Sequence, residues 1–274
     1  MLSLEQIEEY RRSSSLLLPG FFSQEAVENL QKWSLQLPLI EGVQVTFEKG
    51  AITRCEDFMG RHEGFASVAG NSSALARLCG ELFGESGSCL VKEKLNFKPP
   101  GGAGFMPHLD HPSLAFYLPP QCTSFITAMV AIDDMTSPNG CLRVHRAVWD
   151  QSNAVDCVPP EGDPEVGGRA GAITEQALER LQFEDIECKA GDVFVFNGWV
   201  RVKKKKKKKK RIFADFFRKK VPHRSGPNMT NHCRRGVFFT YNPASHGDYQ
   251  DSYYQVGIKK EGDFFHFHII LFRA

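Results

Sequence analysis

A histidine and an aspartate stand one residue apart, as His108 and Asp110, after a lead-in rich in proline and glycine. Side chains two positions apart on an extended segment point to the same side, so this imidazole and this carboxylate can reach one metal ion from a single strand end. Two histidines and one carboxylate on one face of a metal form the site of non-haem Fe(II) oxygenases. The pair alone is common, and it becomes informative only with a distant histidine and an anchor for a cosubstrate.

Length and composition are those of an ordinary globular protein. The 274 residues are 42% hydrophobic and 24% charged, and we expect them to form one domain over residues 1–274. No apolar run reaches the roughly 18 to 20 residues of a membrane span, and the N-terminus lacks the pattern of a secretory signal. Eight scattered cysteines without a Cys-x-x-Cys pair suggest reduced thiols. These features predict a cytoplasmic protein that does not bind membranes.

The formal charge of +2 hides one unusual segment. Residues 201–221 hold thirteen of the 34 Lys and Arg residues but one of the 32 acidic residues, and eight consecutive lysines occupy 203–210. The rest of the chain therefore has 21 basic and 31 acidic residues, a net charge of −10, which does not suggest nucleic acid binding. The lysine run repels itself, so we predict a disordered insertion that binds nucleic acid only non-specifically.

Removing this insertion joins Trp199-Val200 to Pro222-His223 without a break in pattern. Valine codons begin with GT, and lysine codons can supply a terminal AG. We therefore hypothesise that residues 201–221 are a retained intron and that residues 256–274 are an atypical C-terminal tail from read-through at a second donor. Codons for the lysine run in the mature transcript would defeat this hypothesis.

The elements expected around the motif are helices first and short strands after them. Helices are predicted over residues 4–12, 23–37, 73–83 and 174–181. Strands are predicted over residues 16–22, 89–98, 125–132, 141–144, 193–196 and 236–241. Helices followed by many short strands with turn signals predict an α+β chain with a β-barrel or jelly-roll core.

Several short motifs occur in the order and at the spacing of a known family. They are Asn96 to Pro100, His108-x-Asp110, Asn139-Gly140-Cys141-Leu142, Ala190-Gly191-Asp192, His223-x-Ser225-Gly226-x-Asn228 and Arg234. With this set the chain resembles the phytanoyl-CoA dioxygenase family of Fe(II)/2-oxoglutarate oxygenases over about residues 90–242. The resemblance implies a double-stranded β-helix (jelly-roll or cupin-like) core with the N-terminal helices packed on one sheet.

The resemblance also implies the metal site. It assigns the ligands to His108, Asp110 and His223, a face that suits Fe(II) and leaves positions for 2-oxoglutarate and O2. In related halogenases a small residue replaces the carboxylate so that chloride can bind. Because Asp110 is a carboxylate, hydroxylation with release of succinate and CO2 is favoured.

Further residues are implied for the cosubstrate. The resemblance places Arg234 on the distal carboxylate of 2-oxoglutarate, where a guanidinium can bind in a bidentate manner, with a hydrogen bond from Ser225. Lys94 and Thr127 fall where the family has further contacts with the cosubstrate. Arg235 would point to the opposite side of an extended strand, so the two arginines are alternatives, and the family spacing favours Arg234.

The substrate is the more open question. Segments around Arg54, His62, Asn96 and Tyr241 resemble the branch that hydroxylates 2-aminoethylphosphonate and its N-methylated relatives. Arg54, His62 and Asn96 are therefore candidates for contact with a small substrate, and Lys94 could add a charge, although surface ion pairs are the alternative for Arg54 and Lys94. A hydroxylase of another small metabolite or of an acyl-CoA, and a catalytically impaired binding protein, remain as alternatives, the last because the insertion ends just before His223. The oligomeric state is left open.

Overall fold

The computed structural model describes residues 1–110, 114, 117–119, 121–122, 124–146, 171–200 and 221–255. Its helices are α1 (Leu4–Ser13), α2 (Gln24–Gln36), α3 (Glu63–Ala69), α4 (Ala74–Phe83) and α6 (Glu175–Leu178), with short 3-10 helices η1 (Leu37–Leu39) and η3 (Ala244–His246). Its strands are β1 (Ser15–Leu18), β2 (Gln44–Glu48), β3 (Ala51–Glu56), β4 (Ser88–Lys98), β5 (Phe105–His108), β6 (Ser124–Ala131), β7 (Leu142–Val144), β8 (Glu184–Ile186), β9 (Val193–Val200), β10 (His223–Ser225) and β11 (Arg234–Pro243). The expected C-terminal tail, 256–274, and residues 201–220 of the expected insertion lie outside the described residues.

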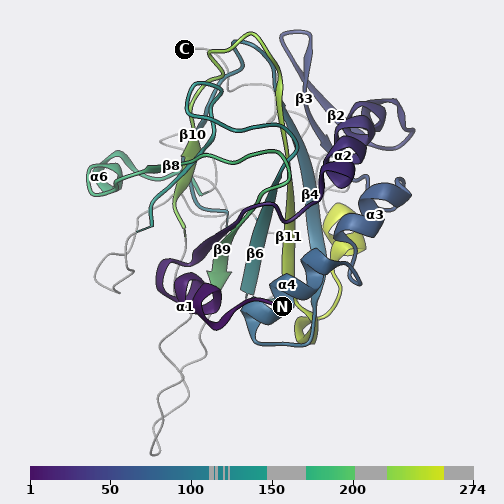
Figure 1. The fold of residues 1–274 in the computed structure, drawn as a ribbon, viewed down its shortest axis with the longest axis vertical. Helices are drawn as coiled ribbons and strands as arrows, with labels where there is room; N and C mark the ends of the chain where they lie inside the picture. Colours follow the sequence, from purple (N-terminus) through teal and green to yellow (C-terminus); the bar gives the residue numbers. More distant parts are fainter. Residues whose placement is uncertain are drawn as a thin grey trace, which may run out of the picture.

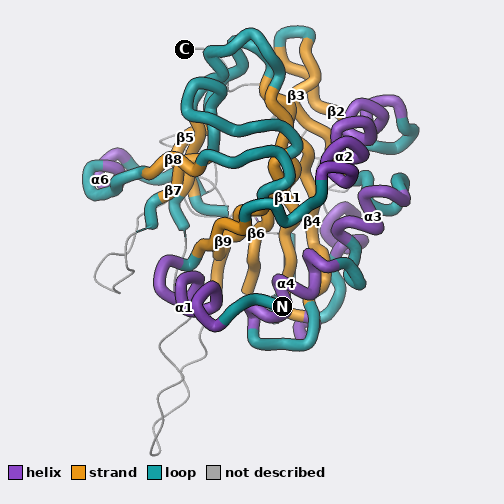
Figure 2. The backbone as a smooth tube through the Cα atoms, viewed as in Figure 1, coloured by secondary structure: helices purple, strands orange, loops and turns teal. Residues whose placement is uncertain are grey.

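Two antiparallel sheets form the predicted double-stranded β-helix. The larger sheet has the strand order β1-β9-β6-β11-β4-β3-β2, and the smaller has the order β5-β10-β7-β8. Helices α2, α3 and α4 lie along the larger sheet, on the side away from the smaller sheet (Figures 1 and 2). The predicted α+β class and the placement of the N-terminal helices are therefore confirmed. Within the described part of the chain, every helix is too short or too polar to cross a membrane.

The larger sheet is buried on both faces because its central strands alternate between two cores. On β6, Ile126, Ala128 and Val130 pack with the helices, whereas Met129 and Ala131 pack with the smaller sheet. Strand β9 repeats the pattern. Toward one end of the space between the sheets, the lining side chains become polar and surround a cavity.

Local signals in the sequence explain most helix starts. Ser3, Ser23 and Ser73 each accept a hydrogen bond from a backbone N–H of the first helical turn, and Ser3 takes part in the predicted capping box. The strand predicted over 16–22 was too long: β1 ends at Leu18 because a turn follows, with Gly20 at φ +59°. The last predicted helix is likewise only the single turn α6, and the β2–β3 hairpin was not predicted.

Candidate metal and cosubstrate site

Strands β5 and β10 bring a histidine pair together. His108 ends β5 and lies opposite His223, the first residue of β10, in the antiparallel register. Asp110 follows two residues after His108, and its Oδ1 lies 3.6 Å from the Nε2 atoms of both histidines. One ligand atom from each of the three residues lies within 4.8 Å of the others. The local His-x-Asp pair and the distant histidine are therefore close enough to bind one metal ion together.

Backbone carbonyls determine which nitrogen of each ring faces the carboxylate. His108 Nδ1 lies 2.8 Å from Met106 O, and His223 Nδ1 lies 3.0 Å from Val221 O. A carbonyl oxygen only accepts, so each Nδ1 carries the hydrogen and each Nε2 presents its lone pair toward Asp110. Burial, and then the neighbouring His223, lower the pKa of His108 to about 3, which keeps that ring neutral. Two lone pairs beside a carboxylate form a donor set that fits Fe(II).

Thr127 of β6 is hydrogen-bonded to the carboxylate of Asp110. Its Oγ1 donates to Asp110 Oδ2 at 3.4 Å and lies 3.2 Å from Thr240 Oγ1 of β11. Thr127 also lines the cavity. It can therefore orient a candidate metal ligand, in addition to the contact with the cosubstrate that the sequence suggested.

A cavity of about 160 Å³ borders the three candidate ligands and receives side chains from both sheets. Strand β4 gives it a polar wall, because every second side chain of that strand lines the cavity: Lys92, Lys94, Asn96 and Lys98. Lys98 is paired in register with Arg234 of β11, whereas Lys94 is paired with Glu56 of β3. The wall thus has an Arg234 end and a β3 end, separated by about 13 Å of strand.

The Arg234 end holds two of the four predicted cosubstrate residues, Arg234 and Ser225, whereas Lys94 lies at the β3 end. Arg234 is buried, its guanidinium donates to Gly140 O, and its Nε has no partner. Ser225 of β10 lines the same part of the cavity, and its Oγ accepts from Lys98 Nζ at 2.8 Å. Within the described residues no carboxylate lies within ion-pair distance of Arg234. A buried cation without an anion is unfavourable, so this end of the cavity fits a carboxylate ligand.

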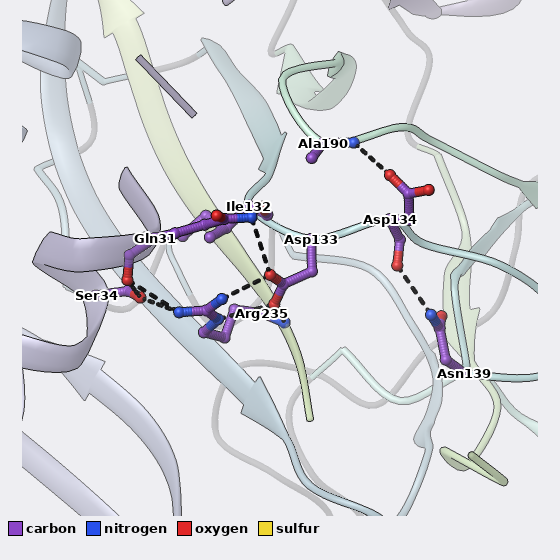
Figure 3. A network of polar contacts seen from close by, with 8 residues as sticks. All are labelled: Gln31, Ser34, Ile132, Asp133, Asp134, Asn139, Ala190 and Arg235. Atoms are coloured by element: carbon purple, nitrogen blue, oxygen red, sulfur yellow. Dashed lines mark hydrogen bonds and ion pairs between the residues drawn. The ribbon is translucent and has the colours of Figure 1, made fainter. Parts of the chain in front are cut away.

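Arg235 points toward Asp133 and α2, and its charge is already balanced by that carboxylate (Figure 3). Its Nε lies 2.8 Å from Asp133 Oδ2 and a terminal nitrogen lies 2.6 Å from Oδ1. It also donates to Gln31 O and Ser34 Oγ of α2, both at 2.9 Å. Of the two alternative arginines, only Arg234 lines the cavity.

The β3 end of the cavity carries a cluster of charges. Glu56 Oε2 lies 3.5 Å from an Arg54 nitrogen, and its Oε1 lies 3.2 Å from Lys92 Nζ, so one carboxylate serves two cations. Burial opposes its ionisation, but Lys92 and Arg54 lower the pKa of Glu56 to about 2. Lys94 has no carboxylate within ion-pair distance among the described residues. Burial, and then Arg54 and Lys92, lower its pKa to about 7.

Two of the three candidate substrate residues line the cavity and the third does not. Arg54 and Asn96 line the cavity, and the buried Oδ1 of Asn96 has no hydrogen-bond partner. His62 does not line it. Instead, His62 is the N-cap of α3 and its Nδ1 accepts from Phe65 N at 3.3 Å. Sequence reasoning overlooked Lys98, although the polar alternation of β4 places it on the same face as Lys94 and Asn96.

His223 keeps its place in the sheet despite the preceding lysine-rich segment. Val221 is buried and its N–H donates to Asn197 O of β9 at 3.3 Å. His145 N donates to Pro222 O at 2.9 Å, and His223 pairs with both β5 and β7. Val221 and Pro222 therefore hydrogen-bond with neighbouring segments and hold His223 in register.

Comparison with known proteins places this geometry in context. The profile of the family described as phytanoyl-CoA dioxygenase (PhyH) matches residues 10–201. A 2-aminoethylphosphonate dioxygenase from Uncultured bacterium HF130_AEPn_1 is 27% identical over 92% of this chain and 86% of its own length. A methylphosphonate hydroxylase from Gimesia maris is 25% identical over 92% of this chain and 85% of its own.

Solved structures agree on the fold. EctD from S. alaskensis with 2-oxoglutarate and 5-hydroxyectoine superposes with a TM-score of 0.66 at 20% identity, over 89% of this chain and 77% of that one. The epimerase SnoN in complex with Fe3+, alpha ketoglutarate and nogalamycin RO gives 0.65 at 19% identity, over 88% and 83% of the two chains.

Proposed function

The chain belongs to the phytanoyl-CoA dioxygenase family of Fe(II)- and 2-oxoglutarate-dependent dioxygenases, and from this premise we propose that it hydroxylates a C–H bond of a small phosphonate of the 2-aminoethylphosphonate type. One observation carries the proposal. A single cavity contains the His108–Asp110–His223 cluster, a buried Arg234 without an anionic partner in the described chain, and a wall of cations.

In this proposal His108, Asp110 and His223 hold the iron. Bound iron supplies the activation of O2 that accompanies decarboxylation of 2-oxoglutarate. Met106 O and Val221 O hold the two imidazoles as Nε2 donors. The overall reaction is balanced: one oxygen atom of O2 enters the substrate as a hydroxyl group, and the other enters succinate as CO2 is lost.

Arg234 and Ser225 bind the distal carboxylate of 2-oxoglutarate. The guanidinium is buried with its Nε unpaired, and a carboxylate is the partner that a guanidinium fork fits best. Ser225 lies two residues from His223 on β10 and both line the cavity, so a molecule held at Ser225 by its distal carboxylate would extend its 2-oxo acid end toward the candidate metal ligands. This assigns one end of the cavity to the cosubstrate.

The β3 end then receives the substrate. Arg54, Lys92, Lys94 and Glu56 together carry a net charge of +2 when all are ionised, which matches a phosphonate dianion. Glu56 already contacts Arg54 and Lys92. Lys94 has no carboxylate partner among the described residues, so it is the cation that a phosphonate would neutralise. The unpaired Oδ1 of Asn96 is available to an N–H or O–H of the substrate. Both named relatives act on phosphonates, which supports this class.

The test is succinate formation with Fe(II), O2, 2-oxoglutarate and a substrate panel. The panel contains 2-aminoethylphosphonate, its N-methylated forms, methylphosphonate and, as a matched control, 3-aminopropionate, which has a carboxylate in place of the phosphonate. We expect phosphonates to stimulate succinate formation and the control not to. The full chain and a version lacking residues 201–220, which keeps Val221, should both be assayed. No succinate from either version would reject the hydroxylase, and equal stimulation by 3-aminopropionate would reject the phosphonate.

A further inference from the structure

Lys98, the last residue of β4, is buried beside Arg234, with 4% of its surface exposed. Its Nζ lies 2.8 Å from Ser225 Oγ, 2.5 Å from Gly226 O and 3.4 Å from Gly140 O. All three acceptors are uncharged, and no carboxylate lies within ion-pair distance of Lys98 in the regions that the structure describes. Two adjacent buried cations without an anion repel each other and have lost their hydration, which is unfavourable for the folded state. Their placement therefore indicates an anionic ligand.

The hydroxyl of Ser225 leads to the same conclusion. Its Oγ accepts from Lys98 Nζ and from Phe105 N at 3.2 Å. A hydroxyl has two acceptor positions and one hydrogen, so both acceptor positions are used and only the hydrogen is left. No acceptor for that hydrogen lies within reach among the described residues, and Ser225 lines the cavity. The hydrogen is therefore available to an anion in the cavity.

We propose that Lys98 is a positioning residue for 2-oxoglutarate, which fixes the Ser225 hydroxyl as a donor to the distal carboxylate and adds a second positive charge beside Arg234. The inference rests on the proposed function, since it takes the anion to be 2-oxoglutarate. It predicts dependence on the distal carboxylate: a 2-oxo acid that lacks this group gains nothing from Lys98. The competing explanation is structural, because the same three hydrogen bonds also tie the segments at residues 98, 140 and 225–226 together.

The experiment separates these explanations with Lys98→Met and a matched control, Lys189→Met. Lys189 is an exposed lysine that pairs with Asp134 and does not line the cavity. Binding of 2-oxoglutarate and of 2-oxobutyrate, which has no distal carboxylate, is measured by calorimetry on the Fe(II)-loaded proteins without O2. The melting temperature of each metal-free protein is measured in parallel.

We expect K98M to weaken 2-oxoglutarate binding by about 10- to 100-fold, the effect of losing one charge-assisted interaction. Binding of 2-oxobutyrate should be unchanged. The melting temperature should stay the same or rise, because an unpaired buried charge is removed. The K189M protein should behave as wild type in all three measurements. If K98M folds poorly, Lys98→Gln gives the same comparison while keeping a hydrogen-bond donor.

Equal losses for both acids, or a lower melting temperature with an unchanged ratio of the two affinities, would make Lys98 a structural tie and overturn the inference. If the wild-type protein binds neither acid, the proposed function itself fails. Normal binding of 2-oxoglutarate by wild type and by K98M alike would remove only the role of Lys98.

Discussion

Adjacent arginines at the start of β11 allow one matched comparison, Arg234→Met against Arg235→Met. Arg235 makes two contacts with the carboxylate of Asp133 and two with α2. The side chain of Arg235 is only 15% exposed and that of Asp133 only 20%. Losing Arg235 leaves that carboxylate without its cation. Breaking a buried pair costs roughly 3 to 5 kcal/mol, and partial exposure reduces this to about 2 to 3 kcal/mol. We therefore expect R235M to melt roughly 5 to 10 °C lower and to keep its affinity for 2-oxoglutarate.

The R234M variant should show the opposite pattern. Arg234 has no carboxylate partner among the described residues, so its loss should leave the melting temperature unchanged. Two charge-assisted hydrogen bonds to the distal carboxylate, at about 1.5 kcal/mol or more each, correspond to at least roughly 100-fold in affinity. Differential scanning fluorimetry and anaerobic calorimetry measure the two quantities. Normal 2-oxoglutarate binding by R234M, or selective loss of binding in R235M, would refute the assignment of the two arginines.

Three further outcomes are expected. Replacing His62 with Ala should lower stability by about 1 kcal/mol through the lost helix cap while leaving the KM for a phosphonate unchanged; a large rise in KM would return His62 to the substrate site. Burial, and then the charge of Arg234, lower the pKa of Lys98 to about 7, while Cys141 beside it stays protonated with a pKa of about 11. The charged form binds the carboxylate, so the KM for 2-oxoglutarate should be low below pH 7 and rise by up to about tenfold per pH unit above it, and K98M should flatten that profile. Deleting residues 201–220 while keeping Val221 should preserve the melting temperature and 2-oxoglutarate turnover; loss of soluble protein would contradict the register that Val221 and Asn197 set.

Much of the fold follows from local patterns. The capping serines give the helix starts, and the polar alternation of β4 gives the face that lines the cavity. The length of β1 was not predictable from apolar residues alone, because Phe21 and Phe22 continue the run after the turn at Gly20. Similarly, the β2–β3 hairpin has a mixed polar sequence, and its pairing with β4 decides its structure.

The residues of the candidate site could be predicted from motifs, but their arrangement depends on contacts between segments far apart in the sequence. Motifs pointed to His108, Asp110 and His223, but their convergence depends on the pairing of β5 with β10. His62 was proposed from a neighbouring sequence resemblance, and its role as a helix cap depends on where α3 begins. The alternation of β4 indicated the face on which Lys98 lies, but a lysine at the end of a strand has no sequence signal for burial. Only the tertiary contacts with Ser225 and Gly226 reveal it.

Anaerobic titration with Fe(II) measures whether His108, Asp110 and His223 together bind the metal. The wild-type protein should bind one Fe(II) per chain, and Asp110→Ala and His223→Ala should each lose more than about 100-fold in affinity while remaining folded. His145→Ala is the matched control, since His145 lies next to the end of β7 but is not part of the three-residue cluster. Stoichiometric Fe(II) binding that requires Asp110 and His223 but not His145 is the predicted result. Wild-type Fe(II) affinity in D110A or H223A would contradict the assignment of these residues as metal ligands.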